Sequence, residues 1–227
     1  MHELQVITFD AAGTLMVPHP SVGEAYAAAL ERRGISADAD RIEGRFRESF
    51  KSGQERSSKA MLQPRVFWRG IVVDSISEYC PAQEIESVFD ELWEHFGRGR
   101  NWRLLEGVQS TLESLRDHGL RLAVLSNNDS RLRTVLEDQG IAWFFEEIFV
   151  SSEIGLGKPE PAVFQHVEEV FQLPASSFLH VGDDSLRDAE AARNAGWEAI
   201  LVTDQAGDGL RVGQLSEIPE LLAGLPA

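Results

Sequence analysis

The sequence contains one cysteine, Cys80, among its 227 residues. A single thiol forms no intrachain disulfide and supplies no thiolate cluster for zinc, and this usage is typical of a reducing compartment. Long apolar runs are also missing: none approaches the roughly 18 residues that a membrane-spanning helix needs. The first four residues lack the basic and apolar regions of a signal peptide. We therefore expect a cytoplasmic protein that has no membrane partner.

Positive charge is scarce. The chain has 21 lysines and arginines against 37 aspartates and glutamates, which gives a formal net charge of −16. A protein of this sign repels the phosphates of nucleic acids and anionic lipids, so the expected partner is a small molecule and not a nucleic acid. Only three of the cations are lysines, Lys51, Lys59 and Lys158, and each is a candidate for a specific role. No pattern in the sequence indicates an oligomeric state.

Short apolar runs alternate with helical patterns in the second half of the chain. One further apolar run lies near the N-terminus. Such runs are typical of parallel strands covered on both faces; they occupy residues 4–9, 121–125, 148–150, 178–181 and 199–202. The helical patterns lie at residues 108–118, 130–139, 161–171 and 185–194. Strands alternating with helices imply right-handed crossovers, so we predict an α/β fold with a Rossmann-like open parallel sheet.

The stretch from 17 to 103 interrupts this alternation. It shows no convincing strand, and its apolar residues recur at helical spacing in four segments, residues 22–33, 39–50, 65–79 and 83–96. The polar residues 51–59 read as a loop between two of these helices. We therefore predict an all-helical cap domain, residues 17–103, inserted into an α/β core domain formed by residues 1–16 and 104–227.

Polar clusters follow three of the predicted strands, and a fourth precedes a predicted helix. They begin at Asp10, Ser126 and Asp183, and the fourth contains Lys158. Each alone has an ordinary explanation, since Ser126 can cap the next helix and Lys158 can be a solvated loop residue. In an open α/β sheet, however, ligands bind at the carboxyl ends of the strands. Because all four clusters are expected at that one edge, we interpret them as a single functional site.

The order of these motifs resembles the haloacid dehalogenase (HAD) superfamily, in its helical-cap (C1) subfamily. The motifs are Phe9-Asp10 with Gly13-Thr14-Leu15, Leu125-Ser126-Asn127, Gly157-Lys158-Pro159, and His180-Val181-Gly182-Asp183 with Asp188. The resemblance covers essentially the whole chain. It implies a Rossmann-like core, a mobile helical cap inserted after the first strand, and a hydrolase that acts through a covalent aspartyl intermediate.

The resemblance also implies roles for individual residues. Asp10 would be the nucleophile, and its carboxylate would attack phosphorus, or carbon in the dehalogenases. Ser126 and Lys158 would be catalytic, and Ser126, the amide of Asn127, Lys158 and Thr14 would bind the substrate. Lys158 would place its positive charge against Asp10 and the transferring group.

Three acidic side chains, Asp10, Asp183 and Asp188, are expected to crowd together. Like charges about 5 Å apart repel by roughly 3 kcal/mol per pair at an effective dielectric constant near 20, so a cation must neutralise them. Oxygen ligands without histidine or cysteine favour Mg²⁺, which would bind Asp10 and Asp183, with Asp188 in its outer sphere. The resemblance implies that the backbone carbonyl of Ala12 is a further ligand. Asp184 is equally compatible with a capping role and a metal contact. His180 lies inside an apolar run and reads as a core histidine that is not catalytic.

Ala12 departs from the family pattern, because HAD phosphatases carry a second aspartate at this position, two residues after the nucleophile. That aspartate protonates the leaving oxygen and then activates water. Loss of a general acid–base costs about 10²–10⁴-fold in rate. We therefore expect alkyl phosphates to be poor substrates, whereas aryl and acyl phosphates, whose leaving groups need no proton, suffer less.

Ala12 also leaves other functions open beside a Mg²⁺-dependent hydrolase of a small phosphorylated substrate. One is a weak or inactive HAD-fold protein that serves in binding or regulation. Another is cleavage of a carbon–phosphorus bond, because phosphonoacetaldehyde hydrolases have alanine here and use a cap lysine, which would be Lys51 or Lys59. Strict dehalogenases carry an aromatic residue at this position, so Ala12 weighs against carbon–chlorine cleavage.

Overall fold

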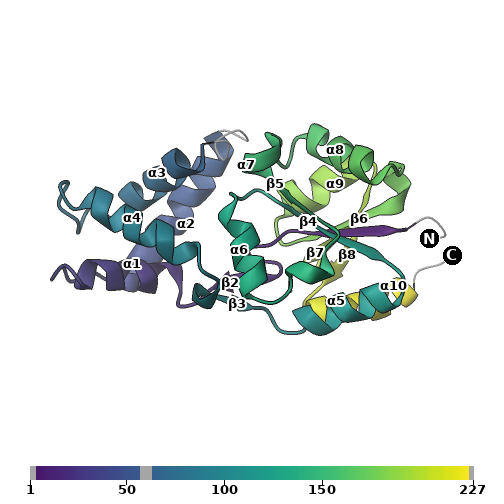
Figure 1. The fold of residues 1–227 in the computed structure, drawn as a ribbon, viewed down its shortest axis with the longest axis horizontal. Helices are drawn as coiled ribbons and strands as arrows, with labels where there is room; N and C mark the ends of the chain where they lie inside the picture. Colours follow the sequence, from purple (N-terminus) through teal and green to yellow (C-terminus); the bar gives the residue numbers. More distant parts are fainter. Residues whose placement is uncertain (1–3, 57–62, 225–227) are drawn as a thin grey trace.

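The computed structural model describes residues 4–56 and 63–224 and contains a six-stranded sheet in which every strand is parallel to its neighbours (Figure 1). The strand order is β5-β4-β1-β6-β7-β8. The strands are β1 (Val6–Phe9), β4 (Arg121–Ser126), β5 (Glu147–Val150), β6 (Phe178–Gly182), β7 (Glu198–Val202) and β8 (Leu210–Val212). The predicted α/β fold and its five strands are confirmed. The sixth, β8, is too short to show an apolar pattern of its own.

Helices cover both faces of the sheet because consecutive residues of the central strands are buried on opposite sides. Ile7 and Phe9 of β1 belong to one apolar cluster, and Val6 belongs to another. The first cluster is closed by α5 (Val108–Asp117), α6 (Arg131–Asp138) and α10 (Ile218–Ala223). The second is closed by α8 (Pro161–Phe171) and α9 (Ala191–Asn194). In Figure 1 α5 and α10 lie below the sheet, and α8 and α9 lie above it.

Short helical turns connect several of these elements. They are α7 (Ser151–Ile154) and the 3₁₀ turns Gly99–Asn101, Ala142–Phe144, Ala175–Ser177 and Leu215–Glu217. The helix predicted at residues 185–194 differs from a regular α-helix, because its first part, Ser185–Glu190, is a π-helix that continues into α9. The wide turn begins where the Asp184 carbonyl accepts hydrogen bonds from the amides of both Asp188 and Ala189.

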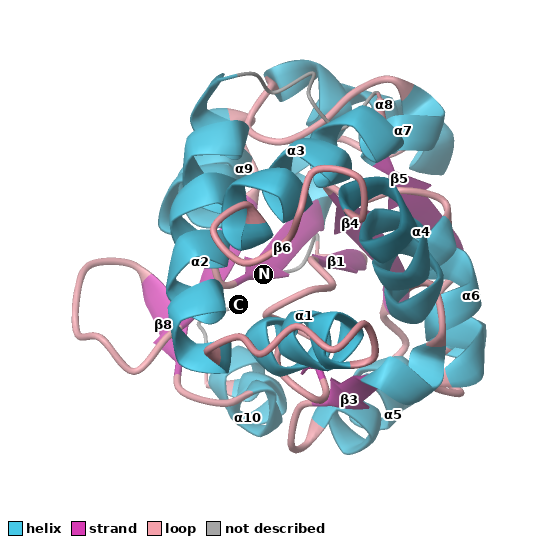
Figure 2. Cartoon of the chain, turned by 90° about the vertical axis from the view of Figure 1, so that its left-hand side faces the viewer, coloured by secondary structure: helices cyan, strands magenta, loops and turns pink. Residues whose placement is uncertain are grey.

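Four helices form an insertion between the first strand and the rest of the sheet: α1 (Val22–Glu31), α2 (Ala39–Arg56), α3 (Pro64–Ile76) and α4 (Ile85–Phe96). We call this group the helical insertion. Its own apolar core includes Tyr26, Ile76 and Leu92. The helices lie together on the left of Figure 1, away from the chain ends, and they face the viewer in Figure 2.

The loop predicted at residues 51–59 is wrong for residues 51–56, which extend α2; residues 57–59 lie outside the described part of the chain. Two physical reasons explain the extension. The segment is rich in lysine, glutamine, glutamate and arginine, which are good helix formers. In addition, Gly53 is buried against α3, where an added Cβ would lie 3.0 Å from the Phe67 ring.

The prediction that residues 17–103 contain no strand is also wrong. Strand β2 (Met16–Pro18) pairs antiparallel with β3 (Trp102–Leu104), with Met16 opposite Leu104. Three-residue strands, one of them containing a proline, show no alternation that a sequence pattern could reveal. The chain enters the helical insertion through β2 and leaves it through β3, and the predicted domain boundaries fall within these two strands. The division into core and cap domains stays a prediction.

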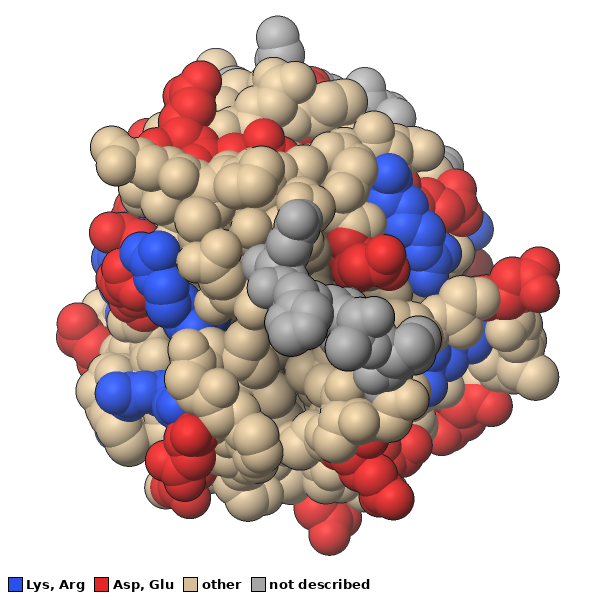
Figure 3. Space-filling view, turned by 90° about the vertical axis from the view of Figure 1, so that its right-hand side faces the viewer, with Lys and Arg blue, Asp and Glu red and all other residues tan. Residues whose placement is uncertain are grey.

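Acidic and basic side chains are interspersed on the face opposite the helical insertion, where lysine and arginine form small separate patches (Figure 3). Within the described residues, no helix combines the length and the apolar character needed to cross a membrane.

Candidate active site

The sheet brings the predicted polar clusters to one edge. Phe9 of β1 is in register with Val124 of β4 and with Val181 of β6. The amide of Asp10 donates a hydrogen bond of 2.9 Å to the Val181 carbonyl, so the chain leaves β1 and β6 side by side. Asp10 therefore emerges next to Asp183, from strands that are about 170 residues apart in the sequence.

Three carboxylates meet at this edge, and we call Asp10, Asp183 and Asp188 the carboxylate cluster. One oxygen from each lies within 4.8 Å of the others. The backbone must approach closely to allow this. Gly13 has φ +99°, which favours glycine, and an added Cβ would lie 2.5 Å from a carboxylate oxygen of Asp183. Gly182 is equally restricted, because its added Cβ would collide with Asp188.

Lys158 is buried in the middle of this negative charge. Its Nζ lies 3.0 Å from Oδ1 of Asp10 and 2.5 Å from Oδ1 of Asp188, and its side chain is 2% exposed. The Asn127 side chain fixes the lysine's backbone from both sides: it donates to the Lys158 carbonyl at 2.6 Å and accepts from the Lys158 amide at 2.8 Å. The Asn127 carboxamide thus positions Lys158. The predicted contact between the Asn127 backbone amide and substrate stays a prediction.

His180 belongs to the same network. It is fully buried, as expected for a core histidine, and Nδ1 lies 2.7 Å from the Thr8 hydroxyl. Its Nε2 lies 3.3 Å from Nζ of Lys158 and 3.2 Å from Oδ1 of Asp188. Burial and the neighbouring Lys158 charge lower the pKa of His180, which favours the neutral ring. The sequence offered a signal for this position, since His180 interrupts an apolar strand three residues before Asp183.

The cluster has three carboxylates and one lysine, and the lysine contacts only Asp10 and Asp188. Asp188 has a pKa well below its ordinary value, because the Lys158 and His180 contacts outweigh its burial. The charges of Asp10 and Asp188 raise the pKa of Lys158, although burial alone would lower it. Burial raises the pKa of Asp10, and Lys158 offsets this only in part. Asp183 is exposed to the solvent, but the protein packed around its carboxylate and the charges of Asp10 and Asp188 raise its pKa to about 7.

This donor set fits Mg²⁺. The cluster offers only oxygen ligands, and its three carboxylates share a single lysine, so negative charge is in excess. Asp188 already accepts hydrogen bonds on both oxygens, from Lys158 and from the Asp184 amide. Asp10 and Asp183 are therefore the carboxylates that could bind the ion directly, and Asp188 suits the outer sphere.

The remaining predicted residues occupy distinct places. Thr14 is buried and donates a hydrogen bond of 3.1 Å to Asp183, so its hydroxyl orients that carboxylate. Ser126 is buried at the end of β4. Asp184 caps the π-helix, because its side chain accepts hydrogen bonds from the amides of Leu186 and Arg187. Of the two cap lysines, Lys51 is exposed on α2 and Lys59 lies outside the described residues.

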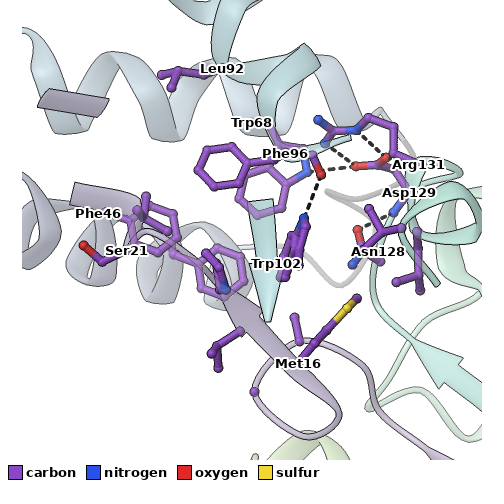
Figure 4. Close-up of a pocket in the computed structure, with 18 of the residues that line it drawn as sticks. Met16, Ser21, Phe46, Trp68, Leu92, Phe96, Trp102, Asn128, Asp129 and Arg131 are labelled. Atoms are coloured by element: carbon purple, nitrogen blue, oxygen red, sulfur yellow. Dashed lines mark hydrogen bonds and ion pairs between the residues drawn. The ribbon is translucent and has the colours of Figure 1, made fainter. Parts of the chain in front are cut away.

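A cavity of about 600 Å³ lies between the helical insertion and the sheet edge, and we call it the insertion cavity. Ala12, Gly13, Asn127 and Asp183 border it on the sheet side, so it reaches the carboxylate cluster. Its other walls are mostly aromatic and aliphatic, and several aromatic rings face into it (Figure 4). Ala12 is exposed, at the position that the resemblance gives to a second aspartate.

Sequence reasoning missed Asp129 and Arg131, which follow β4 and connect the core to the helical insertion. Asp129 is 1% exposed and accepts a hydrogen bond of 3.1 Å from the Trp68 indole on α3. Arg131 forms two hydrogen bonds of 2.7 Å with this carboxylate (Figure 4). Its guanidinium lies 3.5 Å from the centre of the Trp93 ring on α4. The only signal in the sequence was an acid and a base two residues apart after a strand.

Comparison with known proteins places the chain in a family. The sequence profile of the haloacid dehalogenase-like hydrolases matches residues 4–196. The chain therefore belongs to the haloacid dehalogenase-like hydrolase family. The insertion of α1–α4 after the first strand is consistent with the helical-cap subfamily, so the resemblance seen in the motifs is confirmed.

The curated relatives share this family name. Haloacid dehalogenase-like hydrolase domain-containing protein 3 from Mus musculus is 29% identical over 206 residues, which cover 88% of this chain and 82% of the relative. The Drosophila melanogaster rhythmically expressed gene 2 protein is 23% identical, with coverage of 91% and 85%.

Solved structures show the same fold. The HAD-hydrolase YfnB from Bacillus subtilis, bound to magnesium, superposes with a TM-score of 0.77 at 19% identity, covering 97% of this chain and 99% of that one. A 2-haloacid dehalogenase from Pseudomonas syringae pv. Tomato DC3000 gives a TM-score of 0.68 at 25% identity, with coverage of 97% and 98%.

Proposed function

We propose that this hydrolase is a Mg²⁺-dependent phosphatase that acts on a small phosphorylated substrate through a covalent intermediate on Asp10. The observation that carries the proposal is the position of Asp10. Its carboxylate lies at the sheet edge, 3.0 Å from the buried ammonium group of Lys158 and within 4.8 Å of Asp183. A nucleophile, a fixed cation and an oxygen-rich metal site thus meet beside a substrate-sized cavity.

Each residue has a defined task in this proposal. The Asp10 carboxylate attacks phosphorus, and the bond from phosphorus to the leaving oxygen breaks. Lys158 stays charged because two acids contact it, so it favours the ionised form of Asp10 and stabilises the charge on the phosphoryl oxygens. Asp188 and the Asn127 side chain hold Lys158 in place. Water then attacks the acyl phosphate and releases inorganic phosphate from Asp10.

Asp10 and Asp183 would hold the Mg²⁺ ion, together with the Ala12 carbonyl that the family resemblance implies. A bound divalent cation neutralises the cluster and reduces the repulsion between Asp10 and an incoming phosphate dianion. Mg²⁺ dependence is supported by the oxygen-only ligands, by the excess of three carboxylates over one lysine, and by the magnesium bound to YfnB, whose fold is shared.

The test is hydrolysis of acetyl phosphate, whose leaving group needs no proton. We expect Mg²⁺-dependent release of phosphate that chelation abolishes and that Asp10→Asn reduces by at least about 10³-fold. Asp183→Asn should also lose the response to Mg²⁺. The matched control is Asp184→Asn, the same exchange at the next residue, where asparagine still caps the helix.

Three other outcomes would replace the proposal. Mg²⁺ binding without turnover of any phosphate or phosphonate would favour a binding or regulatory protein. Chloride release from 2-chloropropionate without phosphatase activity would favour the dehalogenase reaction of the Pseudomonas syringae neighbour. Borohydride trapping of phosphonoacetaldehyde on Lys59 would favour carbon–phosphorus cleavage; Lys51 is exposed on α2 and does not line the insertion cavity.

A further inference from the structure

The insertion cavity differs from the carboxylate cluster that it adjoins, because its walls are aromatic. Phe46 and Phe50 of α2 stack at 5.7 Å between ring centres, and Phe50 stacks on Trp68 of α3 at 5.6 Å with nearly parallel rings. Phe96 and Trp102 meet edge to face at 6.3 Å on another wall. Figure 4 shows Phe46, Trp68, Phe96 and Trp102 around one space, which Phe50 also lines. Flat apolar rings of this kind bind best to a flat apolar group.

The two arginines that line the cavity are each paired with a carboxylate that also lines it. Arg131 contacts both oxygens of Asp129, which is buried. Arg47 donates a hydrogen bond of 3.1 Å to Glu43 within α2. A second anionic group on a substrate would have to compete with these carboxylates for the guanidinium groups. The described walls of the cavity therefore favour a leaving group that carries no charge of its own.

The sheet side of the cavity adds a restriction on the chemistry. At Ala12, the wall next to the carboxylate cluster carries a methyl group and offers no proton to the leaving oxygen. A leaving group that departs without a proton must be stable as an anion. Phenols and carboxylic acids satisfy this condition, and of the two, the phenols supply the flat apolar ring that fits the stacked walls.

We propose that the substrate is an aryl phosphate, the phosphate monoester of an uncharged phenol-type hydroxyl group whose ring occupies the insertion cavity. This inference rests on the proposed function. Asp10 forms a bond to phosphorus while the phosphorus–oxygen bond to the ring breaks, and the phenolate departs with the electron pair. Water then attacks phosphorus, the bond to Asp10 breaks, and phosphate and the Asp10 carboxylate are released. The phenolate takes up a proton from solvent.

Four phosphate esters test separately whether the leaving group must be stable as an anion and whether it must be an uncharged apolar ring. Benzyl phosphate keeps the apolar ring but has a poor leaving group, and we expect its kcat/KM to be at least about 10²-fold below that of phenyl phosphate. 2-Naphthyl phosphate buries roughly 45 Å² more apolar surface than phenyl phosphate, so its kcat/KM should be about sevenfold higher. 3-Carboxyphenyl phosphate should fall at least about tenfold below phenyl phosphate, because its carboxylate enters an apolar cavity.

Acetyl phosphate distinguishes the failure of this inference from that of the proposed function. If neither acetyl phosphate nor any aryl phosphate is hydrolysed in the presence of Mg²⁺, the proposed function is overturned and the inference with it. Turnover of acetyl phosphate that depends on Asp10, with equal kcat/KM for the naphthyl, phenyl and carboxyphenyl esters, overturns only the inference. A preference for the carboxyphenyl ester does the same, since it would assign Arg131 to a substrate anion.

Two truncations in one aromatic cluster locate the binding surface. Phe50 lines the cavity. Phe67 packs edge to face on Phe50 and Trp68, with ring centres 6.1 and 5.2 Å apart, but does not line the cavity. Phe50→Ala should lower the ratio of kcat/KM for naphthyl phosphate to that for acetyl phosphate by about tenfold or more, and Phe50→Leu should restore part of it. Phe67→Ala should leave the ratio within about twofold. Equal effects of the two truncations would contradict the proposed position of the ring.

Discussion

Replacing Ala12 by aspartate should convert the protein into one that hydrolyses alkyl phosphates. Ala12 is exposed to the insertion cavity, so the cavity has room for a carboxyl group there. Each carboxylate about 5 Å away contributes roughly 3 kcal/mol of repulsion at an effective dielectric constant near 20, and Mg²⁺ and Lys158 offset part of it. We expect the pKa of the introduced acid to rise by about one to two pH units above the ordinary value near 4. The group then keeps a useful protonated fraction at mildly acidic pH.

The expected gain in kcat/KM for benzyl phosphate is about 10²–10⁴-fold, which corresponds to roughly 3–5 kcal/mol of barrier. Phenyl phosphate should gain less than about tenfold, because its leaving group needs no proton. The assay compares both esters in the wild type, Ala12→Asp and Ala12→Asn. The asparagine variant has the same size but holds no transferable proton. Equal rates for the two variants, or an equal gain for both esters, would refute the reasoning.

Three further predictions concern the network around the site. Lys158→Met leaves Asp10 and Asp188 without their buried cation and should lower the free energy of unfolding, measured with urea, by about 3–5 kcal/mol; a loss below about 1 kcal/mol would contradict this. Trp68→Phe removes the hydrogen bond to Asp129 and should cost about 1 kcal/mol. The same exchange at the exposed Trp143 removes a hydrogen bond to the Gly140 carbonyl that water can replace, and it should change stability by less than about 0.5 kcal/mol. Protons compete with Mg²⁺ for Asp183, whose pKa is raised to about 7 without metal. Calorimetric titration should therefore show Mg²⁺ affinity falling by about tenfold between about pH 8 and pH 6, and an affinity independent of pH would contradict proton competition at Asp183.

The sequence predicted the parts of the fold that depend on local pattern and on sheet geometry. Parallel strands end at one edge, so polar residues after β1, β4 and β6 had to meet there, and Asp10 and Asp183 do. Lys158 lies in a loop with no periodicity. Its place depended on the family motif, and the Asn127 side chain that holds it was not anticipated.

Features that depend on packing between distant segments were not predictable. The continuation of α2 past residue 50 rests on the contact of Gly53 with α3. The π-turn that directs Asp188 toward Lys158 follows from the carbonyl geometry at Asp184. The contacts of Asp129 with the helical insertion, and the aromatic walls of the insertion cavity, exist only once α3 and α4 lie over the sheet edge.

The most direct test of the account is to detect the covalent intermediate. The protein is mixed with phenyl phosphate and Mg²⁺, quenched in acid during steady-state turnover, and its peptides are analysed by mass spectrometry. We predict one phosphoryl group on Asp10 that hydroxylamine removes and that is missing when Mg²⁺ is omitted. Steady turnover with no phosphoryl group on Asp10, or with the label on another residue, would contradict the assignment of Asp10 as the nucleophile.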